Sequence, residues 1–125
     1  MNKLLRILVI LPAIIFVVTG LRYILDPASA AAQFGMPLLD GVGRSSQIGN
    51  IAAYFLSLGL FILIAVSTGK RFWFYPAAII IGLTAIFRVL AWLIQDAALA
   101  TNLIVPEVII TCLLMFAASR MPERE

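Results

Sequence analysis

Long apolar stretches alternate along the chain with short segments of polar and turn-forming residues. A helix needs about 20 mostly apolar residues to cross the hydrocarbon core of a bilayer. Four stretches are that long, and they cover residues 4–25, 46–68, 72–95 and 102–120. The pattern therefore predicts an all-α protein, a four-helix transmembrane bundle that forms a single membrane domain over residues 1–125.

The segments between these stretches carry residues that end helices. The first separator runs from Asp26 to Ser45 and contains several Asp, Pro and Gly residues, whereas the other two are Thr68 to Arg71 and Asp96 to Thr101. Because the last two separators are short, we expect the second, third and fourth spans to be sequential antiparallel neighbours.

A short surface helix is expected at residues 27–34, inside the first separator. Asp26 can cap its N-terminus, Pro27 suits its first position and Gly35 can end it. Such a helix is either a connector on the lipid headgroups or a lid over a site below it.

Composition excludes a soluble domain. Apolar residues make up 63% of the 125 residues and charged residues 12%, whereas roughly 25% of the residues of a soluble domain are charged. A soluble chain of this length also cannot bury so much apolar surface. The lipid bilayer is therefore the expected solvent and first partner.

Cations flank the spans unevenly. On one side lie Lys3, Arg6, Lys70, Arg71, Arg120 and Arg124, and on the other lie Arg22 and Arg44. The positive-inside rule then places both termini and the middle loop in the cytoplasm; the family resemblance described below implies that the membrane is the bacterial inner membrane. No basic run suggests a nucleic-acid partner.

A cleavable signal peptide is the alternative interpretation of the first span. Lys3 and Arg6 precede an apolar run, and residues 28–30 (Ala-Ser-Ala) resemble a cleavage site. The run is long enough to span a membrane, however, and Arg22 and Asp26 fit a cleavage region poorly. We therefore expect the first span to be retained.

Few residues offer catalytic or metal-binding chemistry. The chain has no histidine, the commonest transition-metal ligand and the usual general base near neutral pH, and its one cysteine is Cys112. We therefore expect no metal and no cofactor. Catalysis by Glu107 beside Arg88 is a less favoured interpretation than binding.

Helical spacing gives each span one polar or small face. The faces are Thr19, Arg22, Tyr23 and Asp26; Gln47, Asn50, Tyr54 and Ser57; Thr84, Arg88, Ala91 and Gln95; and Glu107, Thr111, Leu114 and Ala118. At about 1.5 Å per residue, Arg88 and Glu107 lie at similar depths in the outer half of the membrane. We expect the two residues to meet in a polar chamber above an apolar inner half.

The polar chamber has two interpretations of different class. In the first it holds an amphiphile with an acidic or carbonyl-bearing head, such as a lipid or quinone, and the ligand-binding residues are Arg22, Asn50, Tyr54, Arg88 and Glu107. In the second the protein is a structural accessory subunit of a larger membrane complex, possibly a redox complex, and Arg88 and Glu107 only pair. Homo-oligomers are also possible partners.

Small residues at Gly49, Ala53 and Ser57 form a ladder that lets helices approach closely. We expect this ladder to pack against another helix of the same molecule rather than against a second copy.

Three short motifs resemble those of the small bacterial DoxX-like four-helix membrane proteins, particularly their uncharacterised members. They are Asp26-Pro27 to Phe34-Gly35, Arg88 late in the third span, and Pro106-Glu107 early in the fourth. The resemblance extends over nearly the whole chain and implies a four-helix membrane fold. Some DoxX-like proteins are linked to quinone-coupled sulfur oxidation or to membrane redox complexes. Since this chain has no histidine and no cysteine pair, it would hold a lipid-soluble ligand or a partner rather than carry electrons.

The orientation can be tested by cysteine labelling in a variant in which Cys112 is replaced by Ala. An impermeant thiol reagent added to intact cells should label Ala98→Cys and should leave Asn2→Cys unlabelled, because the cation distribution places position 2 in the cytoplasm. Labelling of position 2 from outside would reverse the topology.

Overall fold

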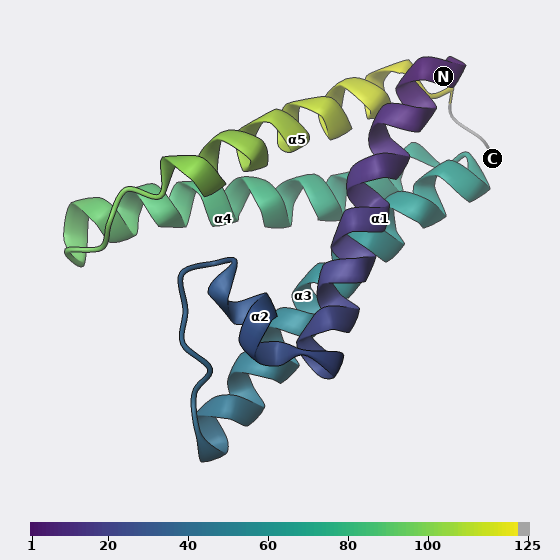
Figure 1. The fold of residues 1–125 in the computed structure, drawn as a ribbon. Coiled ribbons are helices and arrows are strands. Elements are labelled where there is room, and N and C mark those ends of the chain that lie inside the picture. Colours follow the sequence, from purple (N-terminus) through teal and green to yellow (C-terminus); the bar gives the residue numbers. More distant parts are fainter. Residues whose placement is uncertain (123–125) are drawn as a thin grey trace.

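The computed structural model describes residues 1–122, which form helices joined by short connections (Figure 1). The elements are α1 (Lys3–Leu25), α2 (Pro27–Ala32), α3 (Gly41–Thr68), the 3-10 turn η1 (Arg71–Trp73), α4 (Phe74–Ile94) and α5 (Thr101–Arg120). The predicted all-α bundle with a short helix between the first two spans is confirmed. Arg124, one of the cations used to predict the orientation, lies outside the described residues.

Within residues 1–122, four helices are long and apolar enough to cross a membrane: α1, α3, α4 together with the 3-10 turn before it, and α5. Large apolar side chains cover their outward surfaces, as Leu11, Ile15, Ile79, Phe87 and Ile109 illustrate. Such surfaces suit contact with lipid rather than with water. The chain is therefore a small multi-pass membrane protein.

Helix α3 begins at Gly41, earlier than the span predicted from 46. Asp40 occupies its N-cap position, and the Arg44 amide donates to the Asp40 carbonyl oxygen. The helix has 28 residues and is therefore about 42 Å long, whereas the hydrocarbon core is about 30 Å thick. Apolar content revealed the membrane-spanning part, and the more polar first turns extend beyond it.

The surface helix α2 is shorter than the predicted 27–34. Asp26 holds the N-cap position, without a capping hydrogen bond from its side chain, and Pro27 is the first helical residue. The helix ends at Ala32, and Gly35 follows in the left-handed conformation with φ 73°, which glycine adopts without strain. The expected roles of Pro27 and Gly35 are both found.

Two glycines let α1 cross α3 closely. A Cβ atom on Gly59 would lie 2.5 Å from Val17 Cγ2 and 2.7 Å from the carbonyl oxygen of Ala13. A Cβ atom on Gly20 would lie 3.0 Å from the carbonyl oxygen of Ala52. Each helix thus contributes one glycine, and the space that a side chain would need at that position is filled by the other helix.

The predicted packing role is wrong for Gly49 and Ala53, two of the three residues of the ladder. Gly49 and Ala53 are exposed, and a Cβ atom on Gly49 would meet nothing within 4 Å. Helix α1 instead crosses the neighbouring face of α3, which carries Ala52 and Gly59. A ladder of small residues permits close approach but does not decide which face a neighbouring helix takes.

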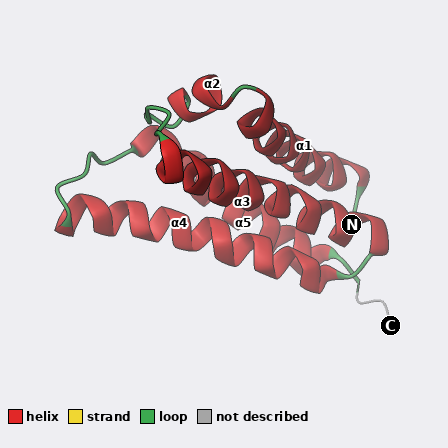
Figure 2. Cartoon of the chain, turned by 90° about the horizontal axis from the view of Figure 1, so that it is seen from below, coloured by secondary structure: helices red, strands yellow, loops and turns green. Residues whose placement is uncertain are grey.

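The main core occupies only one end of the bundle. Its buried residues are Leu5, Val9 and Ala13 of α1; Leu58, Ile62, Ala65 and Val66 of α3; Phe74, Ala77, Ala78 and Ile81 of α4; Leu114, Ala117 and Ala118 of α5; and Met121. Figure 2 shows the start of α1, the end of α5 and the α3–α4 turn at this end, which we call the closed end.

At the opposite end, the open end, the helices separate into two pairs. Helix α1 packs chiefly on α3 and α4 packs chiefly on α5, with far less contact between α1 and α5. Figure 1 shows the two pairs diverging from the closed end, where α1 begins and α5 ends. Space between the pairs therefore opens where the core stops.

The crossing of α1 and α3 gives a matched pair of glycine variants. Gly59→Ala should lower the free energy of unfolding in mild detergent by about 1–3 kcal/mol, because the added methyl group overlaps α1. Gly49→Ala should leave it unchanged or raise it by up to about 1 kcal/mol, because its methyl group meets open space. Thermal unfolding compares the two variants, and equal stability would contradict the close crossing.

Candidate functional site

Arg88 of α4 and Glu107 of α5 form an ion pair near the base of the open end. The Arg88 Nε atom donates to both carboxylate oxygens, at 2.9 Å to Oε1 and 3.2 Å to Oε2. The side chains keep 29% and 16% of their surfaces exposed. The predicted pairing of Arg88 with Glu107 is confirmed, and the pair is only partly covered by protein.

Local structure explains why these two side chains meet. The chain reverses between Ile94 and Thr101, so α4 and α5 run antiparallel with Arg88 and Glu107 at matching levels. Asp96 helps the reversal, because it takes the left-handed conformation with φ 56°, which aspartate tolerates better than most residues.

A second polar contact joins α3 to α4 beside this pair. The hydroxyl groups of Tyr54 and Thr84 lie 2.9 Å apart, and the Thr84 hydroxyl also lies 2.8 Å from the Ile80 carbonyl oxygen. If Thr84 gives its single hydrogen to Ile80, Tyr54 is the donor to Thr84. The Tyr54 oxygen then retains lone pairs to accept a hydrogen bond from another group.

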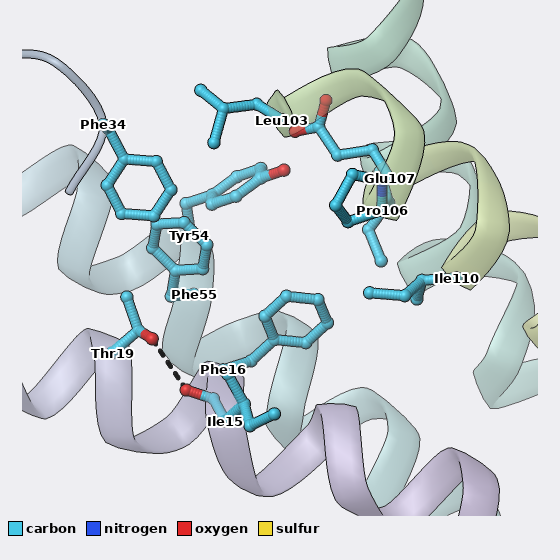
Figure 3. A pocket seen from close by; sticks show the side chains of 11 residues that line it. Ile15, Phe16, Thr19, Phe34, Tyr54, Phe55, Leu103, Pro106, Glu107 and Ile110 are labelled. Carbon is cyan, nitrogen blue, oxygen red and sulfur yellow. Dashed lines mark hydrogen bonds between the residues drawn. The ribbon is translucent and has the colours of Figure 1, made fainter. Parts of the chain in front are cut away.

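An apolar cavity of about 270 Å³ opens between α1 and α5. Figure 3 shows aromatic side chains of α1, α3 and the segment after α2 facing Leu103, Pro106, Glu107 and Ile110 of α5 across it. The full lining is Ile15, Phe16, Thr19, Phe34, Tyr54, Phe55, Ile81, Leu103, Pro106, Glu107 and Ile110. Ile81 belongs to the main core as well as to this lining, so the cavity lies next to the core.

A second cavity, of about 490 Å³, lies between α3 and α4 below the segment that follows α2. Its lining is Phe34, Met36, Asn50, Ile51, Tyr54, Phe55 and Arg88. Phe34, Tyr54 and Phe55 line both cavities and so stand between them. The ion pair spans the same boundary, with Glu107 on the apolar cavity and Arg88 on the second one.

The segment after α2 covers the site instead of only connecting two spans. Phe34 packs with Phe55 and with the fully buried Tyr23, at ring-centroid distances of 5.1 and 6.5 Å. Gln47 holds the next residues, because its Oε1 atom accepts from the Leu39 amide and its Nε2 atom donates to the Pro37 carbonyl oxygen. The lid role of the surface helix stays a prediction, because Phe34 and Met36 line the cavities and no residue of Pro27–Ala32 does.

The structure brings together four of the five predicted site residues. Asn50, Tyr54 and Arg88 line the second cavity, and Tyr54 and Glu107 line the apolar one. Arg22 lines neither cavity, because its Nη1 atom donates to Gln33 Oε1, 2.8 Å away at the end of α2. It therefore does not add a second cation beside Arg88.

Sequence reasoning missed the aromatic walls of the cavities. Phe16, Phe34 and Phe55 line them, yet an aromatic residue in an apolar stretch looks the same whether it faces lipid or a cavity. Gln47 is a polar residue at the start of a span, so a hydrogen-bonding role could have been predicted for it. Its partners in the loop depend on tertiary structure and could not.

No protein-family model, curated protein or solved structure matches this chain. Within residues 1–122, no three His, Cys, Asp or Glu side chains gather in a group that could hold a metal ion. The geometry of the two cavities is therefore the basis for a functional proposal.

The ion pair can be tested by a double-mutant cycle. Arg88→Ala and Glu107→Ala should each lower the free energy of unfolding by about 1–3 kcal/mol, because each leaves a charged partner without its hydrogen bonds in an apolar setting. The double variant should lose clearly less than the sum of the two. Thermal unfolding in mild detergent provides the measurement.

The exposed pair of Arg44 and Asp40, at 3.3 Å, is the control for this cycle. Removing either of its members should change stability by less than about 1 kcal/mol. Strict additivity of the Arg88 and Glu107 substitutions would show that the two side chains do not interact.

Proposed function

We propose that this membrane protein binds an amphiphilic ligand such as a lipid or quinone at its open end. The head would lie beside Arg88, Asn50, Tyr54 and Glu107, and the tail would lie in the apolar cavity between α1 and α5. The observation that carries the proposal is the partly exposed ion pair at the boundary of two cavities.

The exposure of the ion pair argues against a role in cohesion alone. Charges at membrane depth are costly unless protein or water surrounds them, and a bundle that needed only cohesion would cover the pair with side chains. Here the helices diverge beside it instead. A concave, mostly apolar site with a few convergent polar groups is the usual form of a small-molecule pocket.

The walls of the cavities suit an amphiphile. Phe16, Phe34 and Phe55 offer flat apolar surfaces, against which either an acyl chain or a planar ring can pack. Polar groups gather at one side, where Arg88 and Asn50 line the second cavity. The site thus has the same division into a polar and an apolar part as an amphiphile.

The charge distribution supports an outer-leaflet position for this site. Arg6 lies in a surface hollow with Gly69 and Met121 at the closed end, and Arg120 lies in another with Met1. With these cations in the cytoplasm, the open end would face the outer leaflet of a bacterial inner membrane. Membership of the DoxX-like group is part of the same proposal and rests on the three short motifs.

Native mass spectrometry of protein purified in mild detergent tests the binding proposal. The wild type should retain a lipid or quinone, and Arg88→Gln should reduce the retained fraction by about tenfold or more, equivalent to about 1.4 kcal/mol or more of binding free energy. Arg44→Gln removes a cation outside both cavities and should leave retention unchanged. Arg22→Gln should have little effect, because Arg22 is held by Gln33.

Two results would contradict the proposal. One is a wild type that retains no amphiphile when purified with added lipid and quinone. The other is equal retention by wild type and Arg88→Gln. In either case the accessory-subunit interpretation, in which the ion pair serves packing alone, takes its place.

A further inference from the structure

We infer that the site selects an uncharged head that presents a carbonyl oxygen, and that it discriminates against an anionic head. This inference rests on the proposed function and specifies its ligand class. It follows from which charges line the cavities and from which hydrogen-bond donors remain unused.

The charges of the site cancel. Of the residues that line the two cavities, Arg88 and Glu107 are the charged ones, and each carries one charge. Arg22, which would have made the site cationic, is turned toward Gln33. An anionic head bound at Arg88 would lie close to the Glu107 carboxylate, and a cationic head bound at Glu107 would lie close to Arg88. Both would meet repulsion in an apolar setting, where charges are weakly screened.

Arg88 nevertheless retains hydrogen-bond donors. Its Nε atom alone makes the contacts with Glu107, and within residues 1–122 neither of its Nη nitrogens has an acceptor. The guanidinium group is planar and has five N–H donors. Glu107 thus fixes its orientation through Nε, and the N–H groups of the two Nη nitrogens remain for an acceptor in the second cavity.

The other polar groups of the second cavity are neutral. Asn50 is exposed and has no hydrogen-bond partner within the described residues, so its amide can either donate or accept. The Tyr54 hydroxyl already contacts the Thr84 hydroxyl. A carbonyl oxygen placed between Arg88 and Asn50 can receive hydrogen bonds from both side chains without bringing a charge near Glu107.

A competition among three amphiphiles with the same number of carbon atoms tests this selectivity. The probes are hexadecanamide, hexadecanol and hexadecane sulfonate, which present a neutral carbonyl, a neutral hydroxyl and a permanent anion. Wild-type protein in mild detergent receives all three in equal amounts, and native mass spectrometry reports the species retained. The amide should exceed the sulfonate by about tenfold, and the alcohol should fall between them or below both.

Glu107→Gln should remove the preference for the amide, since it removes the carboxylate but keeps the shape of the side chain. The sulfonate should then gain about tenfold or more relative to the amide, because Arg88 is left as an uncompensated cation. Asp40→Asn is the matched control. It removes the carboxylate of the Arg44 pair, whose Asp40 side chain is fully exposed, and should leave the preference unchanged.

The outcomes distinguish a failure of the proposed binding function from a failure of the inferred selectivity. Retention of none of the three probes by the wild type would overturn the proposed function itself. Retention of either the sulfonate or the alcohol as strongly as the amide would overturn only the inferred selectivity. If Glu107→Gln is too unstable to purify, the wild-type competition still decides the inference, because it needs no variant.

Discussion

The arrangement depends on a core that unites all four spans over only part of their length. Near the termini, Ile62, Phe74 and Leu114 are fully buried in one apolar cluster. Gly59 lets α1 approach α3 at the edge of that cluster, beside Ala13, and Gly20 does so beyond it, while α4 stays on α5. Each pair is therefore held together by its own contacts. Between the pairs, the hydroxyl groups of Tyr54 and Thr84 meet, but within residues 1–122 no buried apolar cluster joins the pairs at that level. The cavities lie where the shared packing ends.

Apolar length was enough to predict the four spans, because each lipid-facing helix must be apolar over the whole hydrocarbon thickness. Helical phase and depth were enough to predict that Arg88 meets Glu107, since a short antiparallel connection leaves little freedom in register. The start of α3 was less accessible to prediction. Its first turns lie outside the apolar stretch, so hydropathy carries no information about them.

Contacts that depend on tertiary structure could not be predicted in the same way. Small residues at Gly49 and Ala53 have the same spacing as a packing ladder, yet α1 crosses α3 on the adjacent face. Arg22 shares the depth of the other polar residues, but its long side chain reaches Gln33 instead. Phe34 lies outside the spans and lines both cavities only because α2 folds back over the open end. In each case, the position of a residue along its own helix does not determine which other helix or side chain it contacts.

The opening between α1 and α5 has a consequence for how a ligand would reach the site. These are the first and last spans, and Ile15 of α1 both lines the cavity and is exposed, so the opening faces acyl chains. An amphiphile already dissolved in the membrane would then arrive by two-dimensional diffusion and would shed no water from its tail. Occupancy would follow the mole fraction of the ligand among the surrounding lipids, so even a weak intrinsic preference would fill the site when that lipid is abundant.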